Sequence, residues 1–294
     1  CFKKLEECNK EALKFWKEFK ELSLKEFNKI YEILNVKFDV ISGESLYNTK
    51  MGAIIQELKE KNLLEESEGA LVVSLKKYNL GVCLIQKTDG TSLYATRDIA
   101  LAIDRYNTYK PARMIYEVGS EQKYHFRQFF KVLELMGYSW AKECVHVDHG
   151  LYLDQDGKKF ATRKGKTVFM IDILNETIEL AKKTIEQKNP KLKNKDEVAR
   201  KVAIGAIFYG DLKNTRTHDI IFDIDKFLDF EGDTGPYIQY TYARASSILR
   251  KASKSNKKLD IKEVNEKEIE LIKTINLFPQ AVLNSYNQLS PHII

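Results

Sequence analysis

Residues 113–136, RMIYEVGSEQKYHFRQFFKVLELM, decide the fold. The apolar run at 113–118 is typical of a buried strand, and it ends at Gly119. The following segment, 121–136, places its phenylalanines and leucines on one side of an expected helix. A strand, a glycine and a helix in succession are typical of a doubly wound α/β sheet. Ligands of such sheets bind beyond the carboxyl ends of the strands, so we expect a ligand at 119–122.

Outside this stretch, helical periodicity predominates. Two helices are predicted within 1–35, with Ser23 as the N-cap of the second and Glu26 completing a capping box. Further helices are predicted at 51–64, 97–106, 170–188, 196–210, 236–255 and 265–288. Strands are predicted at 70–75, 82–87 and 144–153, the first two as a pair.

This pattern predicts an α/β fold followed by a helical part. We expect a mostly helical segment at 1–68 and a Rossmann-like part at 69–232, with a basic loop at 158–168. Residues 233–294 are expected to form the start of a helical domain.

The composition narrows the class of protein. The 294 residues suit about two domains, and 43% hydrophobic residues with 14 Gly and 5 Pro exclude collagen, low-complexity sequence and global disorder. No apolar run approaches the ~18 residues of a membrane span. The net charge of +6 is compatible with a nucleic-acid partner. Four cysteines without a CxxC pair and no signal-peptide pattern favour a reducing compartment, so we expect a cytoplasmic protein.

Tyr94 and Asp98 form the first candidate site. They are four residues apart, so on one helix they share a face. A carboxylate there suits a guanidinium, whose planar fork meets it with two hydrogen bonds. Alternatively, Asp98 complements the helix dipole or pairs with Arg97.

Gly119 and Gln122 form the second candidate site, at the turn between strand and helix. Gly119 permits close approach of a ligand to the backbone, and the Gln122 amide offers both a donor and an acceptor. A plain turn with a solvated Gln122 is the alternative. His125 is predicted to be an ordinary helix residue.

Cys144, His146 and His149 give a C-x-H-x-x-H pattern that resembles a zinc site. On a strand, however, His149 would face away from the other two, and no second ligand pair follows at a usual spacing. We therefore predict no metal site. His149 and Gly150 are instead interpreted as a turn beside a nucleobase.

Segment 160–166, FATRKGK, is a glycine-containing basic loop that suits anionic oxygens and matches no P-loop. A solvated hairpin is the alternative. The predicted helix at 236–255 carries tyrosines among cations, which is typical of stacking and phosphate contacts with nucleic acid. An amphipathic core helix is the alternative for this segment.

Taken together, these stretches resemble the class I arginyl-tRNA synthetases. They occur in the family's order, and the similarity covers nearly the whole chain. The matching stretches are SGESLYN (42–48), DGTSLYATRDIALA (89–102), VGSEQKYHFRQFFKVLELMGY (118–138), FATRKGKTV (160–168) and YGDLKNTRTHDIIFDIDKFLDFEGDTGPYIQYTYAR (209–244).

The resemblance implies the second half of a Rossmann-like catalytic domain and the start of an all-α anticodon-binding domain. It implies that ATP, with Mg²⁺ on its phosphates, activates L-arginine as arginyl-adenylate, which then acylates tRNA(Arg). A monomer and no tightly bound cofactor are also implied.

The same resemblance assigns roles to individual residues. Substrate arginine would be bound by Tyr94, Asp98 and Gln122. ATP would be bound by Gly119, His149, Gly150, Phe160 and Gly165. Catalytic residues of the KMSKS-like loop would be Thr162, Arg163 and Lys164, although the loop departs from the stricter family form at Phe160, Ala161 and Arg163. Contacts with tRNA would come from Tyr237, Gln239, Tyr240, Arg244, Arg250 and Lys251.

The sequence lacks the His-Ile-Gly-His-like tetrapeptide of class I enzymes and begins with Cys1. We therefore expect an internal fragment, without the family's N-terminal domain and most of its anticodon-binding domain, that is inactive alone although its parent is an active ligase. Three alternatives are another class I synthetase, a non-catalytic tRNA-binding paralogue, and a general RNA-binding module. Among other class I synthetases, one for glutamate is disfavoured because the Asp98 carboxylate would repel its substrate.

Overall fold

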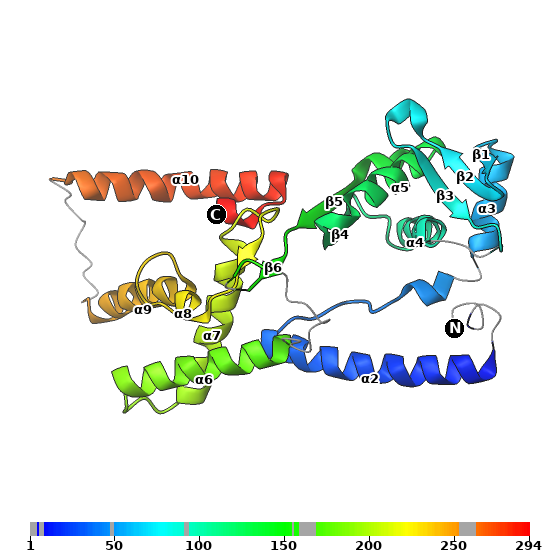
Figure 1. Cartoon of the computed structure of the whole chain (residues 1–294). Coiled ribbons are helices and arrows are strands. Elements are labelled where there is room, and N and C mark those ends of the chain that lie inside the picture. Colours follow the sequence, from blue (N-terminus) through cyan, green and yellow to red (C-terminus); the bar gives the residue numbers. More distant parts are fainter. Residues whose placement is uncertain are drawn as a thin grey trace. The chain divides into compact units, whose positions relative to one another are not determined.

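The computed structural model describes residue 5 and residues 9–47, 50–90, 94–154, 156–158, 169–252 and 263–294. The chain divides into two compact units, Cys1–Asp148 and His149–Ile294, whose elements are coloured along the chain in Figure 1.

The first unit combines helices with two small sheets (Figure 1). Its helices are α2 (Lys10–Leu34), η1 (Glu44–Tyr47), α3 (Met51–Glu60), η2 (Lys76–Tyr78), α4 (Tyr94–Tyr109), η3 (Ser120–Gln122), α5 (Lys123–Leu135) and η4 (Ser139–Glu143). Its strands are β1 (Leu64–Ser67), β2 (Ala70–Ser74), β3 (Val82–Gln86), β4 (Met114–Gly119) and β5 (Cys144–His149), the last of which ends at the boundary.

The N-terminal helix α2 is one continuous helix, and the prediction of two helices within 1–35 is wrong. The helix begins after Asn9, whose side chain accepts a hydrogen bond from the Ala12 N–H, and ends at Asn35 in the left-handed conformation. Ser23 lies inside it. The segment has no glycine or proline, and an interior serine costs less than about 0.7 kcal/mol, so the helix continues.

Strands β1, β2 and β3 form an antiparallel sheet in that order, which confirms the predicted pairing of the two later strands. A two-residue turn at Glu68 and Gly69 joins β1 to β2, and both residues have positive φ, as a type I′ hairpin turn requires. The helix predicted over 51–64 extends into the start of β1. Helix α3 ends earlier because Asn62 adopts a positive φ of 53°.

Helix α5 covers the β4–β5 pair with an aromatic face, as its periodicity predicted. Phe126 stacks on His146 of β5 with ring centroids 4.3 Å apart, and the Phe129 ring meets the Tyr116 ring of β4 edge-on at 5.8 Å. Phe129 is fully buried. These contacts place the first half of α5 against the middle of β4 and of β5.

The second unit is mainly helical. Its elements are β6 (Tyr152–Leu153), α6 (Met170–Lys188), α7 (Lys195–Leu212), β7 (Ile220–Ile221), α8 (Ile224–Phe227), α9 (Gly235–Lys251), α10 (Glu266–Gln288) and η6 (Pro291–Ile293). The α6–α7 pair packs through small residues, with Ala181, Ala199 and Ala203 almost fully buried. The bounds predicted for α6 are confirmed.

Strands β6 and β7 pair in parallel, with Tyr152 opposite Ile220 and Leu153 opposite Ile221. The sequence leaves open whether 144–153 forms one strand or two, and the structure has two, β5 and β6. Strand β7 was not predicted. Two residues are too short to show the alternation of a strand. Within the described ranges, no helix combines the length and apolarity needed to cross a bilayer.

Cys83 and Cys144 are expected to resist alkylation in the native chain. Both are buried free thiols, and burial raises the pKa of Cys83 to about 12 and that of Cys144 to about 11. The thiolate is the nucleophile, so little reactive form exists at pH 8. Mass spectrometry after iodoacetamide treatment should find both unmodified, and both modified once guanidinium unfolds the chain. Equal labelling with and without guanidinium would contradict this.

Candidate functional site: the Asp98 carboxylate and its surroundings

The first turn of α4 is fixed against strand β3. The Thr96 hydroxyl, which is fully buried, donates a 2.6 Å hydrogen bond to the carbonyl oxygen of Ile85. Ile99 on the same helix is also fully buried. This anchoring leaves Tyr94 61% exposed and the side chain of Asp98 partly exposed, one helical turn apart.

Asp98 pairs with His125 on α5. Asp98 Oδ2 lies 2.7 Å from His125 Nε2, and each side chain is 24% exposed. The sequence alone does not predict this contact, because His125 has the pattern of an ordinary helix residue and Arg97 is the adjacent partner available to Asp98. The available signal was position: His125 lies one turn beyond Gln122, at the same ligand-binding end of the strands.

Gln122 ends η3 and directly precedes α5. Its side chain is exposed and forms no helix-cap hydrogen bond. The His125–Asp98 contact holds the start of α5 against the first turn of α4. The residues predicted to bind arginine therefore lie where these two helices meet. The roles of Tyr94, Asp98 and Gln122 themselves stay predictions.

An ion pair joins the first residue of α5 to the end of β5. Lys123 Nζ lies 2.9 Å from Asp148 Oδ2, and the Asp148 side chain is only 8% exposed. His146 Nε2 lies 2.9 Å from the carbonyl oxygen of Val118. Gly119 adopts an ordinary extended conformation with φ of −52°. No three His, Cys, Asp or Glu side chains gather as a metal would require in the part of the chain that the structure describes.

The backbone that packs against residue 150 leaves room only for a glycine. A Cβ on it would lie 2.2 Å from the carbonyl oxygen of His218, and its N–H donates to the Arg216 carbonyl at 2.8 Å. Close packing therefore accounts for this glycine without a ligand. His149 is exposed, and its Nδ1 lies 2.9 Å from the Gly150 carbonyl oxygen. Their predicted contacts with ATP remain untested.

The basic loop lies outside the described residues, and with it Phe160, Thr162, Arg163, Lys164 and Gly165. The structure describes the turn that leads into it. Asp154 Oδ1 accepts hydrogen bonds from the N–H groups of Asp156 and Lys158, at 3.0 and 2.8 Å. Gly157 in the same turn has a φ of 72°.

Helix α9 carries the residues predicted to contact tRNA. Tyr237, Tyr240, Arg244, Arg250 and Lys251 are exposed, and Arg244 Nη1 donates to the Tyr240 hydroxyl at 3.0 Å. Gln239 differs from them. Its Nε2 donates to the Lys201 carbonyl at 3.1 Å and lies against Gly205 of α7, while its buried Oε1 has no hydrogen-bond partner. The structure thus places the Gln239 amide at a helix crossing.

Comparison with known proteins identifies the family. The catalytic-domain model of the class I tRNA synthetases for arginine matches residues 1–224, about three quarters of the chain. The chain belongs to the class I arginyl-tRNA synthetase family. The DALR anticodon-binding domain model matches residues 238–294, which hold most of α9 and all of α10.

Among curated relatives of this synthetase chain, the arginine–tRNA ligase of Clostridium perfringens is 50% identical over 296 residues, covering 100% of the chain and 52% of the relative. That of Clostridium acetobutylicum is also 50% identical, with the same coverage. The chain therefore spans about half the length of the curated relatives it matches. The crystal structure of arginyl-tRNA synthetase from Plasmodium falciparum matches with a TM-score of 0.82 at 26% identity, covering 98% of the chain and 50% of that protein. The Thermus thermophilus structure gives a TM-score of 0.80, also at 26% identity, and covers 89% of the chain and 50% of that protein.

These matches confirm the family and the fold class that the sequence stretches implied. They leave the predicted division at 68 and 232 untested. The assigned site residues also remain predictions.

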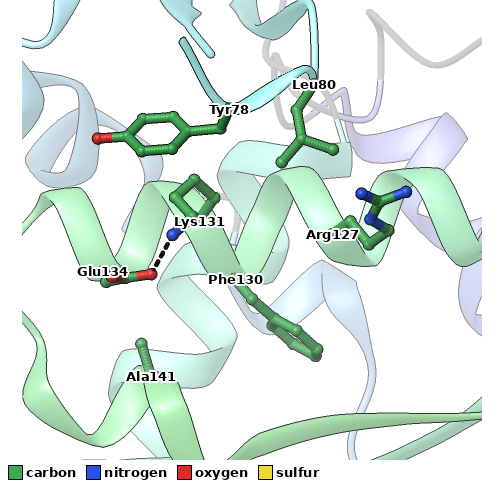
Figure 2. A pocket seen from close by; sticks show the side chains of 7 residues that line it. All are labelled: Tyr78, Leu80, Arg127, Phe130, Lys131, Glu134 and Ala141. Atoms are coloured by element: carbon green, nitrogen blue, oxygen red, sulfur yellow. Dashed lines mark hydrogen bonds and ion pairs between the residues drawn. The ribbon is translucent and has the colours of Figure 1, made fainter. Parts of the chain in front are cut away.

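A shallow pocket of about 410 Å³ lies on α5 away from Asp98. Figure 2 shows Lys131 between Tyr78 and Glu134: its Nζ lies 4.8 Å from the Tyr78 ring centroid and 2.5 Å from Glu134 Oε2. The remaining lining residues are Leu80, Arg127, Phe130 and Ala141. By helical spacing this face of α5 lies roughly opposite His125, so the pocket belongs to a different surface of the synthetase chain.

Proposed function

We propose that this chain supplies the arginine-binding carboxylate, the ATP-contacting loop and part of the tRNA-binding surface of an arginine–tRNA ligase. One observation carries the proposal: in a chain of the arginyl-tRNA synthetase family, Asp98 presents a partly exposed carboxylate beside the exposed Tyr94, held in place by His125. A carboxylate in this setting suits the guanidinium of arginine better than any neutral or anionic side chain.

The proposed reaction has two steps. The α-carboxylate of arginine attacks the α-phosphorus of MgATP, which is a substrate, and pyrophosphate leaves. The terminal ribose hydroxyl of tRNA(Arg) then attacks the acyl carbon of arginyl-adenylate, and AMP leaves. Asp98, Tyr94 and Gln122 would orient arginine, and Thr162, Arg163 and Lys164 would stabilise charge on the phosphates. Cytoplasmic location and a monomeric state remain part of the proposal.

A hybrid enzyme tests this function. In the hybrid, the aligned segment of the Clostridium perfringens relative is replaced by this chain, at 50% identity over that segment. We expect the hybrid to charge tRNA(Arg) with arginine, measured by acid-precipitable radiolabel. A folded hybrid that binds tRNA but charges none would favour the non-catalytic paralogue instead.

The 294-residue chain alone is expected to give no detectable arginylation. Its sequence holds no His-Ile-Gly-His-like tetrapeptide, which class I enzymes use at the nucleotide. Pyrophosphate exchange and tRNA charging should both stay at the level of a buffer control, while circular dichroism shows a folded chain. Arginylation by the purified chain would refute the expectation.

Substituting Arg250→Gln in the hybrid is expected to weaken tRNA binding about three- to tenfold and to reduce the salt slope of log K by about 1. Arg250 is exposed in the last turn of α9, where the guanidinium would contact phosphate. Filter binding at several salt concentrations measures both quantities. Lys226→Gln is the control, because Lys226 is exposed on α8 and pairs with Asp223. Equal effects of the two substitutions would remove the assignment of α9.

A further inference from the structure

The contact between His125 and Asp98 has a role beyond joining two helices. Both helices are anchored to the same strand, β3. Thr96 ties α4 to the Ile85 carbonyl at 2.6 Å. Gln128 Nε2 ties α5 to the carbonyl oxygens of Leu80, just before β3, at 2.7 Å and of Val82, at its start, at 2.8 Å. Strand β3 and the residue Leu80 before it therefore anchor both helices, and the 2.7 Å contact joins two anchored helices.

The imidazole ring of His125 is itself held by aromatic neighbours. It lies nearly parallel to the Phe129 ring, with centroids 6.2 Å apart and an interplanar angle of 11°, and it meets Phe126 edge-on at 5.5 Å. Phe129 is fully buried and Phe126 nearly so. The ring plane is thus set by packing, and Nε2 is directed at the carboxylate.

The contact engages Asp98 through Oδ2 alone. An ionised carboxylate offers about four lone-pair sites on its two oxygens. Because an ionised carboxylate only accepts, the contact requires the tautomer of His125 that is protonated at Nε2. That N–H then occupies one of the sites and fixes the plane of the group, while the other sites stay available. No described residue donates a hydrogen bond to Oδ1. The geometry leaves the carboxylate oriented and still able to accept the paired N–H groups of a guanidinium.

We propose that His125 is a positioning residue for substrate arginine, acting through Asp98. This inference rests on the proposed function of the same site. A preoriented carboxylate avoids the loss of side-chain freedom that binding would otherwise entail, so the benefit appears in arginine affinity. His125 itself need not contact the substrate, and its loss should leave the chemical step and the ATP site unchanged.

The test compares two substitutions in the hybrid enzyme. His125→Phe keeps a flat ring against Phe129 and removes the N–H, and we expect the KM for arginine to rise about tenfold, with kcat within about twofold and the KM for ATP unchanged. His125→Gln restores an N–H donor near the position of Nε2 and should recover most of the arginine affinity. Arg127→Gln, exposed on another face of α5, is the matched control and should leave both KM values unchanged.

Each result has one meaning. An unchanged KM for arginine in His125→Phe overturns the inference. It is also overturned if His125→Gln raises the KM for arginine as much as His125→Phe does while its melting temperature is unchanged. An unaltered hybrid that charges no tRNA overturns the proposed function, and this inference with it. If the hybrid is active and His125→Phe leaves its KM for arginine unchanged, only the positioning role of His125 is overturned.

A spectroscopic measurement on the 294-residue chain checks the pair itself. Long-range ¹⁵N spectra of labelled histidine should show a protonated Nε2 on His125 whose shift changes in Asp98→Asn. The His146 signals should stay in place, because its Nε2 contacts the Val118 carbonyl instead. A His125 ring protonated only at Nδ1 in the free chain would overturn the inference.

Discussion

Replacing Asp98 by asparagine is expected to lower kcat/KM for arginine by about thirtyfold or more in the hybrid enzyme. Loss of one charge from a desolvated hydrogen-bonded ion pair typically costs about 2–5 kcal/mol, and each 1.36 kcal/mol is a factor of ten. Asparagine keeps the shape of the side chain but presents one N–H group where the carboxylate presented an acceptor. The guanidinium then loses its counter-charge and faces a donor.

The same variant should discriminate less between arginine and citrulline. Citrulline is the neutral isostere of arginine, so an anionic partner rejects it chiefly through charge. Pyrophosphate exchange with each amino acid measures the two rates. Asp104→Asn is the matched control: Asp104 lies on the same helix but accepts hydrogen bonds from Lys50 at 2.5 Å and Tyr47 at 3.1 Å. Wild-type arginine kinetics in Asp98→Asn would remove this residue from the site.

Long elements with clear signals were predicted well from the sequence. The α6 bounds match because its apolar period is sustained over nineteen residues. Helix α10 begins one residue after the predicted start because Asn265 and Glu268 form a capping box there. The α5 aromatic face was also predicted, since its phenylalanines repeat at helical spacing. In each of these cases a local pattern determines the structure.

The elements that were missed depend on non-local partners. Strand β7 has two residues and exists because Ile220 and Ile221 pair with β6, some seventy positions earlier. The four-residue strand β1 has one partly buried side chain, that of Leu64, so its pairing with β2 leaves little apolar pattern.

In the candidate site, too, features set by local spacing were predicted and features set by distant partners were not. The shared face of Tyr94 and Asp98 follows from a spacing of four, and the structure places both in α4. The His125–Asp98 contact joins residues 27 positions apart and required the packing of two helices on β3. A single sequence carries no signal for such a pair beyond the position of each residue relative to the strand ends.

Gly235→Ala is expected to destabilise the second unit by about 2 kcal/mol and to lower its melting temperature by about 4–8 °C. A Cβ on Gly235 would lie 2.3 Å from the carbonyl oxygen of Gly205 and 2.7 Å from its carbonyl carbon, on helix α7. The start of α9 has little room to retreat. Thr234 caps it by accepting from the Tyr237 N–H and also donates to the Asp229 carbonyl. One methyl group should therefore force the two helix backbones apart.

Two glycine substitutions distinguish backbone overlap from a general effect of alanine. A Cβ on Gly205 would meet the end of the Gln239 side chain at 2.3 Å, which can rotate away, so Gly205→Ala should cost less than Gly235→Ala. Gly52 on α3 has nothing within 4 Å, so Gly52→Ala should leave stability unchanged or raise it by up to about 1 kcal/mol. Calorimetry ranks the three. Because α9 carries the predicted tRNA contacts, Gly235→Ala should also weaken tRNA binding by the hybrid. Full stability in Gly235→Ala would mean that the α7–α9 crossing is looser than these distances indicate.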